Sequence, residues 1–253
     1  MTPPTVTIAG DAAAVADQAA ARLTQAIERA VAARGRAVIA LTGGGTARTI
    51  YERLASAAGP WRHRIDWSSL HCWWSDERHV PPSHPDSNFG MARDVLLTEV
   101  AIPAPHLHRM RGELEDAQRA AAGYAAELAA LRKGTGGGFL ADVSLLGMGE
   151  DAHIASIFPG SSALYERERL AVAVRPPHLG TWRITMTPPA LLDAATIVVA
   201  ATGARKAAAV AAALSAPLDV ARWPAQLLRA AGGRAAWIID RPAAARWRDA
   251  PPA

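Results

Sequence analysis

Apolar positions along the chain follow two spacings, one typical of helices and one typical of short buried strands. In residues 12–33, apolar side chains recur every three or four positions, for example at Val15, Leu23 and Ile27, which predicts a helix with one buried face. Residues 36–44 instead contain a short apolar run that ends in glycines, as expected for a strand buried on both sides. A helix followed by a buried strand is therefore predicted near the start of the chain.

The same two patterns alternate along the rest of the chain. They predict helices over residues 46–57, 87–100, 115–133, 188–195, 204–214 and 224–231. They predict strands over residues 68–77, 140–149, 170–174, 182–187, 196–203 and 235–240. A loop is predicted at residues 133–138, which are too few for a linker between domains. Short apolar strands that alternate with helices predict an α/β fold, in which a mostly parallel sheet is flanked by helices on both faces, within a single domain over residues 1–253.

Composition agrees with this picture. Of the 253 residues, 50% are hydrophobic and 20% are charged, which is enough to bury a full core. No apolar stretch approaches the roughly 20 residues of a membrane span, and the first residues lack the basic and apolar regions of a signal peptide. We therefore expect a cytoplasmic protein without a membrane partner. The single cysteine, Cys72, has no second thiol for an internal disulfide or a zinc motif.

The charge pattern narrows the class of ligand. The net charge is +4, and the arginines are spread along the chain instead of gathered in one segment. This distribution favours a small anionic ligand, and we expect no binding to nucleic acid. The only lysines are Lys133 and Lys206, so a lysine is an exception in this chain. The sequence makes no prediction of the oligomeric state.

Parallel α/β sheets bind ligands beyond the carboxyl ends of their strands, so the residues that follow strands are candidates for chemistry. The first such segment is a glycine loop formed by Thr42, Gly43, Gly44, Gly45 and Thr46. Its glycines allow an anion to approach the backbone, and its threonines and the free N–H groups of the next helix can donate to phosphate oxygens. The loop matches neither the Walker pattern nor G-x-G-x-x-G, and a tight turn without a ligand is the alternative.

A second strand end carries charge. Asp76 and Arg78 follow the strand with two adjacent tryptophans, and the segment after them, residues 79–88, is rich in proline and polar side chains. Such a segment indicates a loop held in one shape for a function. A solvated surface cluster is the alternative interpretation.

The third strand end lies in LLGMGEDAHIASIFPG, residues 145–160. Two glycines end the strand, and Glu150 and Asp151 are predicted to begin a helix whose first turn contains His153. A neutral imidazole at this edge of the sheet can act as a base, and a neighbouring carboxylate would fix its tautomer. A partly buried histidine bonded to the backbone is the alternative.

Two cations lie at or near the ends of further strands. Arg183 and Lys206 could bind a phosphate together with the glycine loop, the arginine through paired hydrogen bonds and the lysine as a point charge. Taken singly, each would be a surface cation. The two histidines of residues 106–108 lack further metal-binding partners, so we expect no metal. A serine acyl-enzyme is not expected either, because the chain has no G-x-S-x-G elbow.

Seven motifs, in order, are similar to those of the 6-phosphogluconolactonase family. They are LTGGGTARTIYERLA, WWSDERHVPPSHPDSNFGMARDVLL, PHLHRMRGE, LLGMGEDAHIASIFPG, RITMTPPALLDAA, TGARKAAAV and PAQLLRAAGGRAAWIID. Each is weak evidence alone, but together they extend over nearly the whole chain. The resemblance implies a fold like that of glucosamine-6-phosphate deaminase. It also implies hydrolysis of 6-phospho-D-glucono-1,5-lactone in the pentose phosphate pathway, with a small sugar-phosphate lactone as partner and no cofactor.

The resemblance also implies roles by position. Residues 42–46, Arg183 and Lys206 would hold the 6-phosphate of the substrate, and Arg78 would face the ligand. His153 would be the base that activates water.

The resemblance also implies roles for two acidic residues, and the segment that contains one of them, Asp151, departs from the family pattern. Asp151 would orient His153, and Asp76 would be a further acidic residue of the site. Where the family commonly has Asp-Gly-His-Thr-Ala-Ser, this chain has Ala152 for the glycine and Ile154 for the threonine. If that glycine has a positive φ in relatives, Ala152 would cost about 1 kcal/mol.

Two other functions fit the same fold. In a glucosamine-6-phosphate isomerase/deaminase, Asp76 would abstract a proton and His153 would assist ring opening. Deaminases typically carry a tyrosine after the Asp-Glu pair, however, whereas this chain has Arg78, which favours the lactonase. A non-catalytic sugar-phosphate sensor is the second alternative.

Overall fold

The computed structural model describes residues 2–134 and 138–247, and these residues form one large and one small β-sheet. The predicted loop at residues 133–138 lies in part outside the described residues. The large sheet consists of parallel strands in the order β1-β10-β9-β6-β2-β3-β5. Its strands are β1 (Thr5–Ala9), β2 (Ala37–Leu41), β3 (Leu70–Trp74), β5 (Leu107–His108), β6 (Ala141–Leu146), β9 (Ala194–Ala201) and β10 (Ala235–Asp240).

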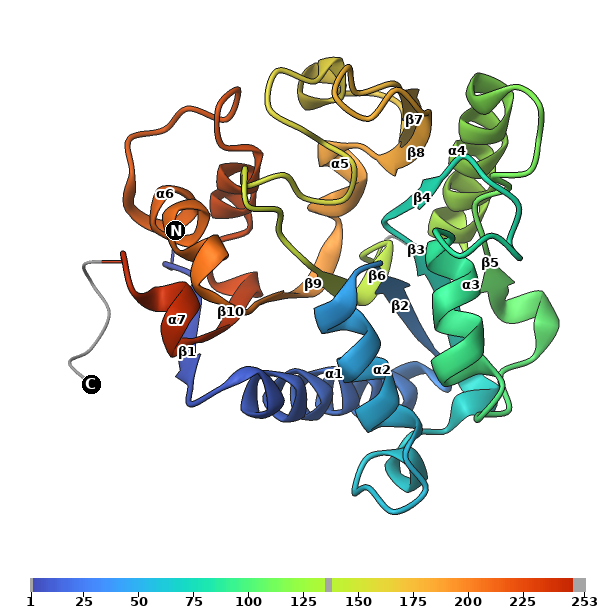
Figure 1. Ribbon diagram of the computed structural model, residues 1–253. Coiled ribbons are helices and arrows are strands. Elements are labelled where there is room, and N and C mark those ends of the chain that lie inside the picture. Colours follow the sequence, from blue (N-terminus) through green and yellow to red (C-terminus); the bar gives the residue numbers. More distant parts are fainter. Residues whose placement is uncertain (1, 135–137, 248–253) are drawn as a thin grey trace.

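The small sheet is antiparallel and has the order β4-β8-β7. Its strands are β4 (Asp76–Arg78), β7 (Ala171–Val174) and β8 (Arg183–Met186). Figure 1 shows the β7–β8 pair standing away from the large sheet, on the side opposite α1. The small sheet therefore adds a wall above one face of the large sheet.

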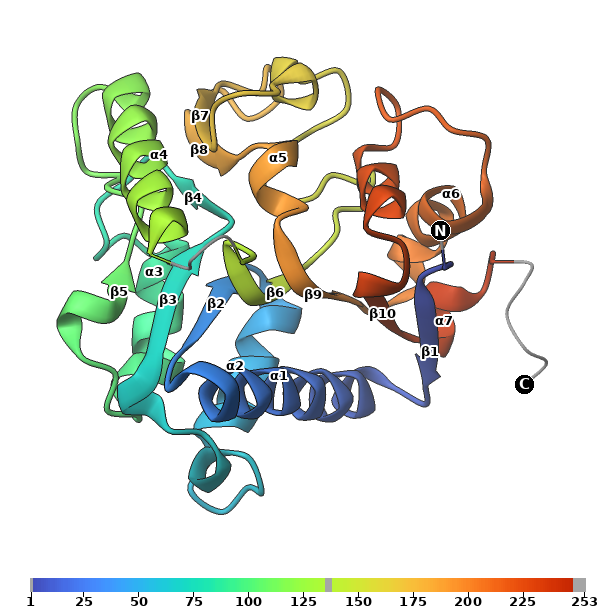
Figure 2. The same cartoon turned by 180° about the vertical axis from the view of Figure 1, so that it is seen from behind.

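Helices cover both faces of the large sheet, as Figures 1 and 2 show from opposite sides. Helices α1 (Ala12–Arg34), α2 (Gly45–Ala55) and α3 (Asn88–Ala92) contribute to one apolar core. Helices α4 (Ala117–Lys133), α5 (Pro188–Leu191), α6 (Ala207–Ser215) and α7 (Arg241–Ala244) contribute to the other, together with the small sheet. The predicted α/β class, with helices on both faces of a mostly parallel sheet, is confirmed.

Short helical turns connect these elements. They are the 3₁₀ turns Arg62–Arg64, Trp67–Ser69, Ala104–His106, Ser162–Tyr165 and Ala204–Lys206, and the π-helical turn Arg93–Leu97 after α3. A longer 3₁₀ segment, Pro224–Arg234, is interrupted at Gly232, which has a φ of +54°. The helix predicted over residues 87–100 is therefore an α-helical turn continued by a π-helical one. The wider π turn still keeps Leu96 buried.

Strand β2 shows why its sequence is apolar without alternation. All five of its side chains are buried. Val38 and Ala40 belong to the core beside α4, whereas Ile39 and Leu41 belong to the core beside α1. Because successive side chains of a strand point to opposite faces, a strand with a core on each side needs an apolar residue at every position.

Two strands of the large sheet were not predicted. Strand β1 lies at one edge, and its first four side chains alternate between exposed and partly buried positions before the buried Ala9, so its segment lacks a continuous apolar run. Strand β5 lies at the other edge and has only two residues, too few for a periodic pattern. Edge strands have a sheet neighbour on one side only, and their sequences are accordingly less constrained.

The strand predicted over residues 68–77 is in fact two strands in different sheets. At Ser75, between β3 and β4, the backbone N–H donates to Leu41 O at 2.8 Å, while the carbonyl accepts from Met186 N at 2.8 Å. The first bond ends the pairing with β2 and the second starts the pairing with β8. This crossing carries Asp76 and Arg78 from the end of the large sheet into the small one.

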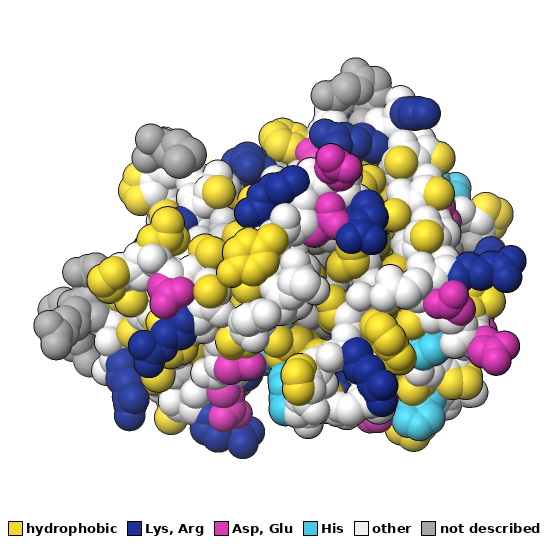
Figure 3. Space-filling model, turned by 90° about the horizontal axis from the view of Figure 1, so that it is seen from above, with side chains coloured by type: hydrophobic (Ala, Val, Ile, Leu, Met, Phe, Trp, Pro, Cys, Tyr) yellow, Lys and Arg dark blue, Asp and Glu magenta, His cyan; other side chains and the backbone are white. Residues whose placement is uncertain are grey.

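Within the described residues, no helix has the length and apolar character that crossing a membrane requires. The face seen in Figure 3 has basic, acidic and apolar side chains interspersed over it.

Candidate active site

Two adjoining cavities lie beyond the carboxyl ends of the central strands of the large sheet. The inner cavity, of about 460 Å³, is lined by the glycine loop and the ends of β6 and β9. The outer cavity, of about 430 Å³, is lined by the small sheet and the segment after β6. The residues that line both are Asp76, Arg78, Gly149, His153, Ala155 and Lys206. The two cavities are thus parts of one cleft, and the candidate base lies where they meet.

The glycine loop forms the floor of the inner cavity. Thr42, Gly43, Gly44, Gly45 and Thr46 all line it, and the loop leads into the N-terminus of α2. Gly44 has a φ of +97°, which a residue with a side chain rarely adopts. At the N-terminus of α2, the free N–H groups and the positive end of the helix dipole face the cavity.

The base of the loop is fixed by side chains. The Tyr51 hydroxyl accepts from Thr42 N and donates to Thr42 O, both at 2.8 Å. A Cβ on Gly43 would collide with the side-chain amide of Asn88, so glycine is required there for close packing. Thr46 Oγ1 lies 3.0 Å from the hydroxyl of Thr202 after β9. Contacts with Tyr51, Asn88 and Thr202 therefore fix the conformation of the loop without a ligand.

His153 is hydrogen-bonded to Asp151. Its Nδ1 lies 2.6 Å from Asp151 Oδ1, and the same carboxylate oxygen accepts from the backbone N–H of His153 at 3.1 Å. Because the carboxylate is an acceptor, the neutral imidazole carries its proton on Nδ1 and directs the lone pair of Nε2 elsewhere. No hydrogen bond to Nε2 occurs within the described residues, and His153 lines both cavities.

The pKa of Asp151 reflects this contact. Partial burial raises the pKa, but the hydrogen bond from His153, its charge and the backbone N–H groups lower it more, to about 2. Asp151 is consequently an anion at neutral pH. An anionic partner stabilises the imidazolium that forms when the histidine takes up a proton.

The turn that carries His153 differs from the prediction. Glu150 and Asp151 do not begin a helix, because they form a turn that is followed by Ala152 with a φ of +62° and, in the next turn, by Ala155 with a φ of +49°. A right-handed helix cannot continue through such residues. Glu150 instead forms an ion pair with Arg205, in which Arg205 Nε lies 3.1 Å from Glu150 Oε1.

Ala152 adopts a positive φ, +62°, without being glycine. The turn is tied to its surroundings by Ala152 O, which accepts from Ala225 N at 2.8 Å. A Cβ on Gly149 would collide with the ring of His153, so this glycine leaves the space in which the imidazole lies.

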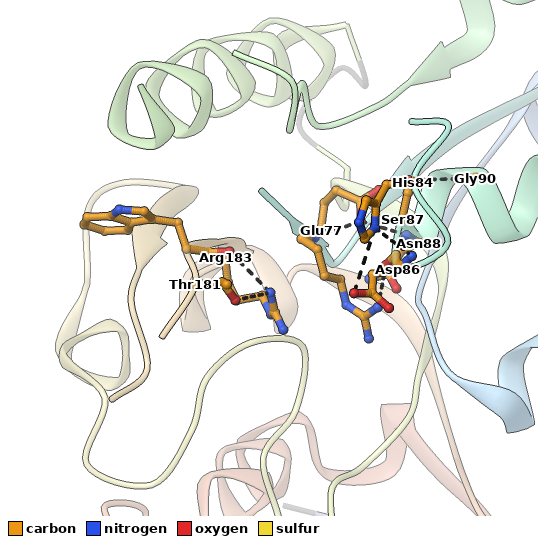
Figure 4. Close-up of polar contacts among 10 residues, drawn as sticks. Glu77, His84, Asp86, Ser87, Asn88, Gly90, Thr181 and Arg183 are labelled. Atoms are coloured by element: carbon orange, nitrogen blue, oxygen red, sulfur yellow. Dashed lines mark hydrogen bonds and ion pairs between the residues drawn. The ribbon is translucent and has the colours of Figure 1, made fainter. Parts of the chain in front are cut away.

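Arg78 and Arg183 form the cationic wall of the outer cavity. They are paired residues of the antiparallel strands β4 and β8. Burial lowers the pKa of Arg183, and the neighbouring charge of Arg78 lowers it further, whereas the carboxylates of Asp76, Asp86 and Glu77 oppose this shift. Figure 4 shows Arg183 beside Thr181 and pointing toward the segment with Asp86, and Arg183 Nη1 donates to Thr181 Oγ1 at 3.0 Å.

Lys206, like Arg78, is a cation that lines both cavities. Half-burial lowers its pKa, and the charges of Glu150 and Asp151 oppose this shift. The turn before it is held by Asp240, whose carboxylate accepts from Gly203 N at 2.9 and 3.0 Å. Lys206 is thus a partly desolvated cation on a fixed turn.

Asp76 is buried below the surface of the cleft. Its carboxylate accepts from Ser156 Oγ at 2.7 Å and, more weakly, from Ser75 and Asn88 at 3.4 Å. Ser156 is 80 residues away in the chain and belongs to the same segment as His153. Asp76 therefore connects strand β4, which carries Arg78, to the segment that carries His153.

The structure places the sequence-predicted residues in one cleft, but it divides them between the two cavities of that cleft. His153 and Arg183 line the same cavity, whereas the glycine loop lines only the inner cavity and Arg183 only the outer one. Sequence reasoning did not select Asn88, Ser156, Thr202 or Asp240. The first two lie inside motifs singled out above, so the available signal was a polar residue at a buried position near a predicted site residue.

Comparisons with known proteins agree with the motif analysis. Residues 10–237 match the family model described as glucosamine-6-phosphate isomerases/6-phosphogluconolactonase. The chain is 36% identical over 208 residues to the 6-phosphogluconolactonase of Haemophilus influenzae, covering 81% of this chain and 85% of that protein.

Solved structures show the same relation. The 6-phosphogluconolactonase from Trypanosoma brucei superposes with a TM-score of 0.83 at 30% identity, covering 97% of this chain and 99% of that one. A glucosamine-6-phosphate deaminase superposes with a TM-score of 0.80 at 20% identity, covering 96% of this chain and 99% of the other, which indicates a shared fold.

Proposed function

Because this chain belongs to the glucosamine-6-phosphate isomerase/6-phosphogluconolactonase family, we propose that it is a lactone hydrolase that converts 6-phospho-D-glucono-1,5-lactone to 6-phosphogluconate. The observation that supports this most directly is the hydrogen-bonded pair of Asp151 and His153, which opens on the same cavity as Arg183 and Lys206. A base and a set of cations in one cleft suit a substrate with a reactive carbonyl at one end and a phosphate at the other.

In the proposed reaction, His153 Nε2 takes a proton from a water molecule, and the resulting hydroxide attacks C1 of the lactone. The carbonyl oxygen becomes an oxyanion, which Arg78 or backbone N–H groups of the cleft stabilise. The C1–O5 bond then breaks, and the ring oxygen takes the proton from the imidazolium. Asp151 keeps the imidazole of His153 oriented and balances its positive charge while the tetrahedral intermediate exists.

The phosphate is bound by the glycine loop, Lys206 and Arg183. The lysine lines both cavities, so a phosphate beside it can meet the loop on one side and the arginine on the other. Charge-assisted hydrogen bonds from several donors fix the position of the ring and so place the carbonyl next to the base.

The proposal covers the chain as one domain with a small sugar phosphate as its partner. Water is the nucleophile and no redox step is involved, so the reaction as written uses no cofactor. We place it in the cytoplasm because a charged sugar phosphate does not cross a bilayer unaided.

One coupled assay tests the function. Purified protein is compared with buffer on 6-phosphogluconolactone and on glucosamine 6-phosphate, because the lactone also opens spontaneously. We expect protein-dependent hydrolysis of the lactone above this background and no ammonia release from the amino sugar. Ammonia release without lactone hydrolysis would replace the proposal with a deaminase, and binding of 6-phosphogluconate without any turnover would replace it with a sensor.

A further inference from the structure

Glu77 is a buried carboxylate outside the cleft. Its side chain is 2% exposed and lines neither cavity, and no ion pair with it occurs within the described residues. Burying a charge without a partner charge is costly unless hydrogen bonds compensate for the lost water. The free-energy cost of burying this carboxylate must therefore be offset by its surroundings. Glu77 lies in the chain between Asp76 and Arg78, which both line the cleft.

Hydrogen bonds from one segment surround this carboxylate. Oε1 accepts from Arg78 N at 2.8 Å and from Asn88 N at 2.7 Å, and Oε2 accepts from Phe89 N at 2.8 Å and from Ser87 Oγ at 3.0 Å. Figure 4 shows Glu77 beside Ser87 and Asn88, which come from the segment that also carries Asp86. The pKa of Glu77 is raised by burial, and these four donors oppose the rise.

Two of the four donors, Arg78 and Asn88, belong to residues that line the cleft. Asn88 lines the inner cavity, and its side chain donates to Asp76 O at 2.9 Å and occupies the space next to Gly43. Arg78 lines both cavities, and its guanidinium donates to the carbonyl of Asp86 in the same segment. The carboxylate thus holds both ends of the segment over residues 78–89, and each end supplies one wall residue.

We propose that Glu77 is a positioning residue of the active site, whose four hydrogen bonds fix Asn88 against Gly43 of the glycine loop and Arg78 at the wall of the cleft. This inference rests on the lactonase function proposed above. Glu77 does not touch the substrate; it acts through the two wall residues. A loss of position of about 1 Å in such residues reduces turnover on the order of 100-fold.

The test compares Glu77→Gln with wild type in the full chain. The amide keeps the size of the side chain but turns one acceptor oxygen into a donor that faces N–H groups. Glu115→Gln, at an exposed position, is the matched control, and Ser87→Ala removes one of the four donors. With folding checked by circular dichroism at the assay temperature, we expect kcat/KM on the lactone to fall on the order of 10–100-fold in Glu77→Gln. It should fall about threefold in Ser87→Ala and stay unchanged in Glu115→Gln.

A double-mutant cycle separates positioning from general stability. If Glu77 acts through its neighbours, adding Glu77→Gln to Arg78→Ala should cost no more than about threefold, the share that remains with Asn88. An equal cost in both backgrounds, or an unchanged kcat/KM in the single variant, would overturn the inference.

Hydrogen exchange gives a readout that does not depend on activity. Amides of residues 79–90 should exchange about tenfold faster in Glu77→Gln, while those of α1 should not change. Unchanged exchange at residues 79–90 would refute the positioning role even if activity fell. An inactive wild-type protein would instead contradict the proposed function, and the exchange result would still decide whether Glu77 holds this segment.

Discussion

Within the described residues, two histidines are hydrogen-bonded to a carboxylate through Nδ1, and only one of these two pairs lies in the cleft. His153 Nδ1 is 2.6 Å from Asp151, and His108 Nδ1 is 2.7 Å from Glu127. The second pair is part of a cluster in which His71 stacks on His106 and on His108, with ring centroids 3.9 and 5.5 Å apart.

The difference lies in the other ring nitrogen. His108 Nε2 is 3.2 Å from His71 Nδ1, so this nitrogen is engaged within the protein. The corresponding nitrogen of His153 has no such bond within the described residues and belongs to a side chain that lines a cavity. A histidine beside a carboxylate is therefore a candidate base only where its second nitrogen remains available to a substrate or water.

The largest change in kcat is expected when the histidine of the cleft is removed, in comparison with the histidine of the other pair. His153→Ala should lower kcat on the order of 10²–10⁴-fold with little change in KM, because it removes proton transfer and leaves the phosphate contacts in place. His108→Ala, the matched change in the other pair, should leave kcat unchanged in folded protein. Steady-state kinetics corrected for spontaneous opening checks both, and equal turnover by His153→Ala and wild type would dismiss His153 as the base.

A smaller effect is expected from the cations of the cleft. Lys206→Ala or Arg183→Ala should raise KM for the phosphorylated lactone about 10–100-fold, since charge-assisted hydrogen bonds contribute about 1.5–3 kcal/mol each. The measurement compares KM on phosphorylated and unphosphorylated gluconolactone. If both substrates are affected equally, these side chains do not bind the phosphate.

The histidine cluster should make stability depend on pH. Burial lowers the pKa of His71 to about 4, and the charges of His106, His108 and Arg36 contribute to the shift. Because the unfolded histidine binds its proton near pH 6.5, the unfolded state holds more protons between about pH 4 and 6.5. Stability should therefore fall as the pH drops through this window.

Thermal unfolding at several pH values measures this effect. The slope of the unfolding temperature between pH 6.5 and 4 should decrease in His71→Gln and persist in His153→Gln. An unaltered slope in His71→Gln would show that the cluster does not carry the pH dependence.

The smallest effect is expected at the turn that carries the candidate base. Ala152→Gly removes a strain of about 1 kcal/mol at a positive φ. It also removes a fully buried methyl group, whose burial contributes about 0.8 kcal/mol. The free energy of unfolding should thus change by less than about 0.5 kcal/mol, and kcat should stay the same. Chemical denaturation measures the first quantity, and a strong loss of stability or activity would show that the Ala152 side chain has a role beyond occupying the turn.

Much of the fold was predictable because burial leaves a local pattern. The helix over residues 12–33 and the strand within residues 36–44 were found from periodicity and appear as α1 and β2. The edge strands β1 and β5 were missed because partial burial or short length weakens the pattern. The helix expected at Asp151 was wrong because positive φ angles at Ala152 and Ala155 are not visible in residue types that also favour helices.

The site residues were predictable from position after strands, but their mutual arrangement was not. Nothing local to Ser75 shows that the chain leaves one sheet for another there, and this crossing puts Arg78 beside Arg183. The four bonds to Glu77 and the bond from Ser156 to Asp76 join residues up to 80 positions apart. Periodicity reports whether a side chain is buried and not which distant group it meets.

The amino-acid sequence by itself determined the α/β class, the order of most elements and the family motifs, because each depends on residues close together in the chain. Tertiary structure decided which cations share a cavity with His153 and why a buried Glu77 is tolerated. It also decided which of the two hydrogen-bonded histidine–carboxylate pairs has a second ring nitrogen without a partner among the described residues. These outcomes depend on hydrogen bonds and packing between distant segments, whose energies are set only when the chain is folded.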